Sequence, residues 1–176
     1  LKVSVGRQVS VLCENSPHLR IRNCLIQYSG GTALQVRECP DACIEYNAIE
    51  HSNNTGADIK SSDNLVFVHN KVLNSACVPG RGGNYNLTHS GILLSGSANG
   101  LIQYNAIDSS GYTGIHLAGI SSCRILNNLV DHSCLVKDDG GGIYIWKNAA
   151  PGNQIAGNIV LNTAGAPEGT NARSEY

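Results

Sequence analysis

A repeat of about 23 residues is the feature that most constrains how this chain can fold. The segment CIEYNAIEHS at 43–52 returns almost unchanged as LIQYNAIDSS at 101–110. Weaker copies begin at four further positions: Leu19, Val66, Arg124 and Gln154. Aligned on a shared asparagine, the copies place six residues in one column: Asn23, Asn47, Asn70, Asn105, Asn128 and Asn158. Repeats of this length are typical of chains built from stacked units, so a repeat architecture is expected.

Each unit carries two short apolar runs. An apolar residue stands three positions before most of the asparagines: Ile44, Phe67, Ile102, Ile125 and Ile155. Another stands two positions after each of them: Leu25, Ile49, Val72, Ile107, Val130 and Val160. A further run follows a glycine, at 56–60, 91–95, 114–118 and 142–146. These runs alternate with period two and are too short for helices, which predicts strands.

Short strands that recur at this period are expected to wind as a parallel β-solenoid of about six to seven coils. Each coil would hydrogen-bond to the next at about 4.8 Å, so that equivalent residues form columns along the axis. An asparagine column is then expected inside the solenoid. Asparagine tolerates the left-handed backbone of a sharp turn, and its amide can bond to the same residue in neighbouring coils. Such a ladder satisfies its own buried polar groups.

The pattern resembles the right-handed parallel β-helix superfamily, the pectin-lyase-like fold built from PbH1 repeats. The resemblance covers residues 9–163, with one departure at Arg20, which occupies the apolar position before Asn23. It implies an all-β, right-handed parallel β-helix with an internal asparagine ladder and a carbohydrate-active role. We expect one β-helix domain at 1–163, followed at 164–176 by a polar exit segment or the start of a further region.

Composition argues against nucleic-acid binding, a membrane-spanning helix and metal delivery. The net charge is −1 and charged residues make up 14% of the chain, so no basic surface for nucleic acid is expected. No segment approaches the roughly 20 apolar residues that a membrane-spanning helix needs. Methionine is absent and no His cluster has ligand spacing, which argues against a metal-delivery protein.

A secreted setting is expected from cysteines and glycosylation patterns. The chain has seven cysteines, and Cys39 with Cys43 or Cys123 with Cys134 are candidate disulfides. Asn53 and Asn86 each begin an acceptor pattern for N-glycosylation. Cysteines are also ordinary core residues, and acceptor patterns arise by chance, so both features have structural alternatives.

In the family that the chain resembles, the sheet formed by the Gly-led runs carries the substrate cleft. Alternation along these runs predicts one outward column of Gln35, Asp58, Leu93, His116 and Tyr144. The second outward column would contain Arg37, Lys60, Ser95, Ala118 and Trp146. The inward positions are aliphatic, whereas the outward ones gather acids, bases and the single Trp. Such a row is suited to holding successive sugar rings.

Two insertions precede Gly-led runs. Successive asparagines of the column are 24, 23, 35, 23 and 30 residues apart, so two coils are longer than the rest. The segment 78–89 lengthens the third coil, and the segment 134–140 lengthens the fifth. Long loops on a rigid scaffold concentrate function, and we expect both loops to wall the Gly-led face.

The acidic end of the second insertion favours a glycoside hydrolase. Asp138 and Asp139 precede three glycines and a strand, which resembles the Asp-Gly-Gly-(Gly/Ala)-Ile-Tyr segment of β-helix proteins grouped with carbohydrate-active enzymes. An Asp pair also supplies carboxylates in polygalacturonase-type hydrolases, although their other signatures are absent here. A hydrolase needs two carboxylates, for which Asp139 with Asp58 or Asp138 are candidates. The alternative role of the pair is turn formation.

Two other functions stay open. A polysaccharide lyase or uronate epimerase would use His116 and Tyr144 for proton transfer. Lys60 and Arg37, or a bound Ca²⁺, would neutralise the substrate carboxylate, and Trp146 would pack against a sugar. A non-catalytic adhesive or sugar-binding solenoid would need only stacked coils, with end-to-end stacking on flanking domains or other copies. In that case these side chains are surface residues.

Overall fold

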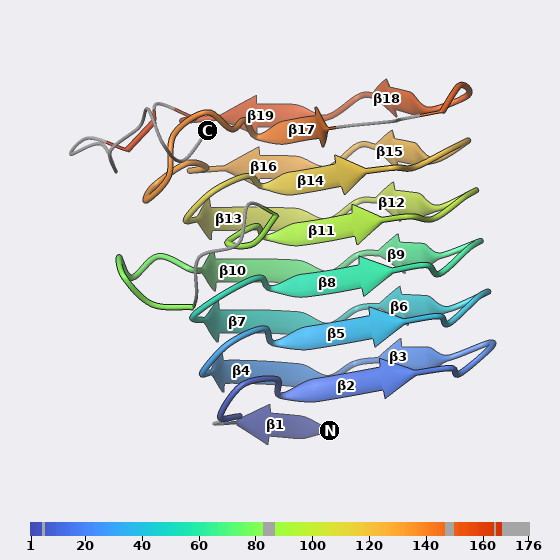
Figure 1. Cartoon of the computed structure of the whole chain (residues 1–176), viewed down its shortest axis with the longest axis horizontal. Coiled ribbons are helices and arrows are strands. Elements are labelled where there is room, and N and C mark those ends of the chain that lie inside the picture. Colours follow the sequence, from blue (N-terminus) through green and yellow to red (C-terminus); the bar gives the residue numbers. More distant parts are fainter. Residues whose placement is uncertain (5, 83–86, 147–149, 164, 167–176) are drawn as a thin grey trace.

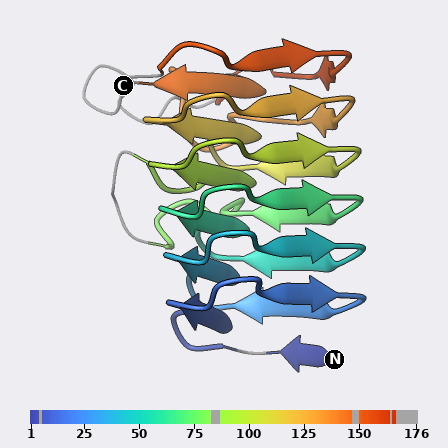
Figure 2. The same cartoon turned by 90° about the vertical axis from the view of Figure 1, so that its right-hand side faces the viewer.

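The computed structural model describes residues 1–4, 6–82, 87–146, 150–163 and 165–166. The described residues form nineteen β-strands in three parallel sheets, with no helix among them. Figures 1 and 2 show these strands stacked as successive coils along one axis. The predicted all-β parallel β-helix is therefore confirmed. No helix long and apolar enough to cross a membrane occurs in the described ranges.

Each coil contributes one strand to each of three sheets, which we call A, B and C. Sheet A contains β1 (Lys2–Ser4), β4 (Leu25–Ser29), β7 (Ala48–Ser52), β10 (Lys71–Ser75), β13 (Ala106–Ser110), β16 (Leu129–Asp131) and β19 (Ile159–Leu161). Sheet B contains β2 (Val11–Glu14), β5 (Leu34–Arg37), β8 (Ala57–Lys60), β11 (Ile92–Ser95), β14 (Ile115–Ala118) and β17 (Ile143–Trp146). Sheet C contains β3 (Arg20–Arg22), β6 (Cys43–Glu45), β9 (Val66–Val68), β12 (Leu101–Gln103), β15 (Arg124–Leu126) and β18 (Gln154–Ala156).

The core lies inside the coils and is filled by the columns that alternation predicts. In β8, for example, Ala57 and Ile59 are fully buried, while Lys60 is exposed. The same two positions are fully buried in β11 and β14. In the last coil Ile145 occupies this column but is 40% exposed, because no described coil covers it.

An asparagine ladder runs through the turn between sheets C and A. Asn105 shows the pattern: its Nδ2 donates to Asn128 Oδ1 at 2.9 Å and to Phe67 O at 2.9 Å. Its Oδ1 accepts from the backbone N of Asn70 at 2.8 Å and from Asn70 Nδ2 at 3.2 Å. Asn47 continues the ladder below and Asn158 above. Nearly every polar atom of these buried amides has a partner, which removes the penalty for burying them.

The first coil corrects the predicted column. Cys24, not Asn23, lies over Asn47, and the backbone N of Cys24 donates to Asn47 Oδ1 at 2.9 Å. Strand pairing shifts the whole first unit by one residue, so that Ile21 pairs with Ile44 and Ile26 with Ile49. The predicted departure at Arg20 and the assignment of Leu25 to the core were therefore wrong. An apolar residue does occupy each of these positions.

In the turns after the first, the left-handed residue is one position earlier than predicted, whereas in the first turn it is Asn23, with φ 53°. Tyr46, with φ 55°, and Tyr104, with φ 55°, precede ladder asparagines and adopt this conformation. So does His69, with φ 56°. The ladder asparagines do not, because each already enters the following strand. Tyr46, His69 and Tyr104 stack in parallel, with ring centroids 4.9 and 5.2 Å apart.

Both insertions lie at the corner between sheets A and B, as predicted. The first follows β10, and Asn54 holds it: its Nδ2 donates to Gly82 O and its Oδ1 accepts from His89 N at 3.1 Å. In the second, the backbone N atoms of Val136 and Lys137 both donate to Gly111 O at 2.8 Å. Each insertion therefore folds back onto a corner one coil nearer the N-terminus.

All seven cysteines are free thiols. Neither candidate pair, Cys39 with Cys43 or Cys123 with Cys134, is joined. Cys39 is fully buried and its thiol donates to Arg37 O at 3.1 Å. Cys123 is also fully buried and donates to Ser121 O at 3.3 Å. These cysteines serve as small core residues with weak donors.

Candidate functional site

The outward columns of sheet B have the predicted register. Gln35 pairs with Asp58, and Asp58 pairs with Leu93. Leu93 pairs with His116, which pairs with Tyr144. The same pairings align the second column: Arg37, Lys60, Ser95, Ala118 and Trp146. The face is therefore charged over its lower coils and aromatic over its upper ones.

Five residues of the lower coils are polar and accessible. Arg37 and Lys60 are exposed on adjacent strands, and Arg37 Nη1 lies 3.8 Å from Glu14 Oε1. Asp58 is half-buried and its Oδ2 accepts a hydrogen bond from Gln35 Nε2 at 2.9 Å. Buried Leu93 separates Asp58 from His116 along the column. Asp58 therefore does not belong to the aromatic part of the face.

Three aromatic side chains meet on the upper coils. The His116 ring lies 5.3 Å from the Tyr144 ring, edge to face, and 6.0 Å from the Tyr112 ring. Tyr112 lies at the corner before β14, and its hydroxyl donates to Asp139 O at 3.1 Å. This bond fixes the end of the second insertion beside the cluster. Trp146, 38% exposed, lies on the strand that carries Tyr144.

Tyr112 was not among the predicted site residues. Burial, followed by the charges of Tyr144, Asp139 and Cys134, raises its pKa to about 12, so its hydroxyl stays protonated and remains a donor. The sequence offers a weak signal for it, because Tyr112 stands in the corner before the strand that carries His116. Only the folded loop shows that it contacts Asp139.

His116 is a buried imidazole without a hydrogen bond. Its exposed fraction is 1%, and within the described part of the chain neither Nδ1 nor Nε2 has a partner. Burial lowers its pKa to about 4, because the protonated ring would lose its hydration. The ring is therefore neutral at neutral pH. Buried polar atoms that lack partners are uncommon in folded proteins and call for an explanation.

This burial predicts an acid-dependent loss of stability. The folded pKa of His116 lies below the unfolded value, so its neutral form stabilises the fold above about pH 6.5. That stability is lost as the pH falls towards about 4, and amounts to about 3 kcal/mol for a shift of this size. We expect His116→Phe to remove this component, as measured by chemical denaturation between pH 7.5 and 4.5. Parallel stability curves for the two proteins would contradict the expectation.

The acidic pair of the second insertion does not form a carboxylate site with Asp58. Asp138 Oδ1 accepts a hydrogen bond from Ala166 N at 2.5 Å. Asp139 is exposed and left-handed, with φ 57°, and its carbonyl is the group that Tyr112 binds. The structure thus places the main chain of Asp139 against Tyr112, which in turn lies beside His116. Asp58 lies two coils below His116.

The remaining predicted sites lie elsewhere. Asn53 is half-buried at the corner beneath the first insertion, and Asn86 lies outside the described residues.

A separate group on sheet A could hold a cation: ligand atoms of Asp108, Asp131 and His132 lie within 4.8 Å of one another. His132 Nδ1 lies 3.3 Å from Asp108 Oδ1 and 3.1 Å from Asp131 Oδ1. Asp108 and Asp131 lie on β13 and β16 of sheet A, so the group is not part of the sheet B face.

Comparison with known proteins identifies the family. The family model for the right-handed β-helix region matches residues 9–173. The chain belongs to the right-handed β-helix family. No curated protein matches this β-helix chain.

A solved β-helix structure is similar to it, the A-module of mannuronan C-5 epimerase AlgE4 from Azotobacter vinelandii. The two sequences are 15% identical and the TM-score is 0.44. The alignment covers 85% of this β-helix chain and 55% of the module, so the chain spans little more than half of the module's length.

Proposed function

We propose that this β-helix protein binds an acidic polysaccharide across the outer face of sheet B and acts on it by proton transfer, as a lyase or uronate epimerase does. The observation that carries the proposal is the buried His116 imidazole, with both nitrogens unpartnered, against Tyr144. Perturbed and unsatisfied titratable groups of this kind cluster at functional sites.

The exposed side chains of sheet B suit an acidic polymer that lies along the solenoid axis. Arg37 and Lys60 stand on neighbouring strands, about 4.8 Å apart. Lys60 can neutralise a sugar carboxylate directly, and Arg37 can do so by exchanging its contact with Glu14 for one with the sugar. Tyr144 and Trp146 lie farther along the same direction and offer flat apolar surfaces with a polar group. The two basic side chains would thus hold the polymer on the lower coils, and the aromatic rings would orient it beside His116.

Proton removal beside a carboxylate is the reaction that this cluster fits. A base takes the proton from the carbon next to the carboxylate, after which a lyase expels the 4-oxygen substituent and an epimerase returns a proton to the opposite face. Tyr144 is half-buried and is the member of the pair that reaches solvent. We assign it the proton transfer. Neutral His116 packs against it edge to face and fixes the orientation of its ring.

A glycoside hydrolase is the second candidate. It would need two carboxylates at a defined separation. Asp58 and Asp138 already accept hydrogen bonds from Gln35 and Ala166, which favours the lyase or epimerase.

We also propose that the protein is secreted, because acidic polysaccharides of this kind lie outside cells and because Asn53 begins an acceptor pattern for N-glycosylation.

Replacement of Tyr144 by phenylalanine tests the proposal. We expect turnover of uronate polymers to fall by about 100-fold, the usual contribution of a general acid or base. Lyase action is measured by the ultraviolet absorbance of the unsaturated uronate. Epimerase action is measured by deuterium uptake at the sugar carbon. Tyr104→Phe removes a hydroxyl from an exposed stack remote from the cluster and should leave turnover unchanged.

Three outcomes separate the candidates. Loss of both signals in Tyr144→Phe, with full activity in Tyr104→Phe, supports proton transfer. New reducing ends without absorbance or deuterium uptake, abolished by Asp139→Asn, would replace it with the hydrolase. Binding of the polymer without any product would leave a non-catalytic sugar-binding protein and overturn the proposal.

A further inference from the structure

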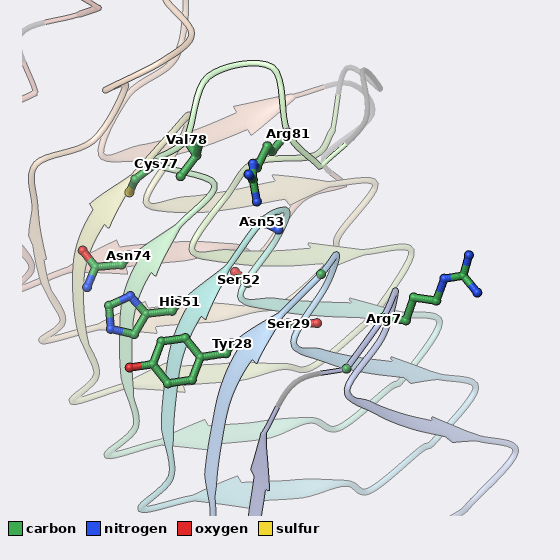
Figure 3. Close-up of a pocket in the computed structure, with 12 residues that line it drawn as sticks. Arg7, Tyr28, Ser29, His51, Ser52, Asn53, Asn74, Cys77, Val78 and Arg81 are labelled. Carbon is green, nitrogen blue, oxygen red and sulfur yellow. The ribbon is translucent and has the colours of Figure 1, made fainter.

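A groove with a volume of about 610 Å³ lies at the corner between sheets A and B, beneath the first insertion. Figure 3 shows it, with Arg81 above, and with Tyr28 and His51 along one side. Its volume lies within the range of about 300–1,000 Å³ that is usual for small-molecule sites. It is separate from the His116 cluster on sheet B, since the residues that line it come from β4, β7, β10 and the corners that follow them, and from the corner after β1.

The side of the groove is a column of three polar residues. Tyr28 and His51 are parallel, with ring centroids 5.0 Å apart and an interplanar angle of 7°. Asn74 occupies the same position in the next coil. Within the described part of the chain, none of the three side chains forms a hydrogen bond. The groove therefore offers a flat aromatic surface together with a hydroxyl, an imidazole and an amide whose hydrogen-bonding capacity is unused.

Charge in the groove is positive. The Arg81 side chain points from the insertion towards Asn53 and Ser52 (Figure 3), and no described acidic group pairs with it. No Asp or Glu occurs among the described residues that line the groove, and Arg7 lies at its rim. Cys77 adds no negative charge, because burial and Asp108 raise the pKa of its thiol to about 11. An anionic ligand is therefore favoured over a neutral or cationic one.

Hydrogen bonds hold the first insertion, which forms the roof of the groove, in place. The Asn54 side chain bonds to Gly82 O and to His89 N, at two points of the insertion. His89, only 3% exposed, has its Nε2 3.1 Å from Arg81 O. These contacts set the height of Arg81 above the Tyr28 and His51 rings. A site that is formed before the ligand arrives loses less affinity to ordering.

We propose that this corner groove binds a sugar unit that bears a carboxylate. Arg81 would hold the carboxylate with its planar guanidinium, and Asn74 and Tyr28 would bond to hydroxyl groups. The sugar ring would pack on the parallel Tyr28 and His51 rings. The choice of a uronate over another anion rests on the proposed function. In this arrangement the groove anchors acidic polymer away from the sheet B face and has no part in proton transfer.

Calorimetric titration of the full chain with a defined oligouronate tests the groove. We expect Arg81→Ala to weaken binding at least 10-fold. Tyr28→Asn, which removes the ring but tolerates the left-handed backbone at φ 57°, should also weaken it. Arg124→Ala is the matched control, because it removes an exposed arginine from sheet C and should bind as the wild type does. A neutral oligosaccharide of equal length should bind far more weakly.

The results also separate the groove from the proposed function. If Arg81→Ala and Tyr28→Asn both bound the oligouronate as the wild type does, the proposal for the groove would be overturned, even if Tyr144→Phe still abolished turnover. Binding that depends on Arg81 in a protein that converts no polymer would support the groove and overturn the proposed reaction. Absence of any oligouronate binding to the wild type would also overturn the groove.

Discussion

Replacement of Asn105 by alanine is expected to lower the free energy of unfolding by about 4 kcal/mol, from the usual cost of leaving buried polar groups unsatisfied. Asn105 is 2% exposed and stands in the middle of the ladder. Without its amide, the backbone N of Asn70 loses its acceptor, and Phe67 O and Asn128 Oδ1 each lose a donor. Asn70 Nδ2 also loses its bond to Asn105 Oδ1, so four groups in the two neighbouring coils are affected at once.

Chemical denaturation measures the loss, with Gln103→Ala as the control. Gln103 lies two residues earlier on β12, is half-buried on the outward side and forms no side-chain hydrogen bond within the described residues. Its truncation should change stability by less than about 1 kcal/mol. Equal losses in the two variants would show that the ladder contributes no more than a surface amide.

Substitution of Gly114 by alanine is expected to destabilise the protein by about 3 kcal/mol or more, which is at the upper end for overpacking a core. An added Cβ at Gly114 would lie 2.2 Å from Val130 Cγ1 and 2.7 Å from Gly142 O. Gly91, one coil below, has the same environment, with Ile107 Cγ2 at 2.5 Å. A glycine precedes four of the six strands of sheet B, β8, β11, β14 and β17, whereas Ser10 and Ala33 stand before β2 and β5. At Gly114 the glycine is needed because the backbone there touches Val130 in the core of sheet A.

Gly141→Ala is the control in the same corner. A Cβ at Gly141 would meet only Ile143 O, at 3.6 Å, which is an ordinary contact. We expect this variant to be neutral or slightly more stable, because alanine restricts the unfolded chain. A thermal midpoint for Gly114→Ala that equals that of Gly141→Ala would remove the steric explanation of the Gly-led runs.

The columns of the fold could be predicted because each follows from a local pattern. Alternation in ADIK and ILLS separates inward Ala57 and Ile59 from outward Asp58 and Lys60, and strand pairing confirms this. The error at Asn23 has a physical origin. An asparagine is favoured both in the ladder and in the left-handed position before it, so the residue type alone does not distinguish the two. The apolar residues Ile21 and Ile26 would have resolved it, since they have the spacing of Ile44 and Ile49.

The loops were predictable in position but not in contacts. The extra residues before β11 and β17 place both insertions at one corner, but which coil each loop covers depends on individual bonds. Asn54 draws the first insertion over Tyr28 and His51, and Tyr112 draws the second towards His116. Both loops were expected to wall sheet B. The first instead forms a groove on the other side of the corner, and no periodic pattern encodes that contact.

The recurrence of Tyr28 and His51 at one position of successive units is a sequence signal for one side of the groove. Both residues end the same kind of strand, 23 positions apart. Stacked aromatic rings on an outer column are predictable from such recurrence. That the rings face a groove is not, because the roof comes from the insertion after β10, two coils after Tyr28 and one coil after His51.

Loop length and coil register are independent in this β-helix. Ala48 pairs with Lys71 after 23 residues, and Lys71 pairs with Ala106 after 35, in the same alignment. Doubling the length of a flexible loop costs only about 0.6 kcal/mol in closure entropy. The corner between sheets A and B can therefore accept transplanted loops of different lengths and chemistries. A family of recognition variants could be engineered there by exchanging one segment at a time, while the scaffold is left unaltered.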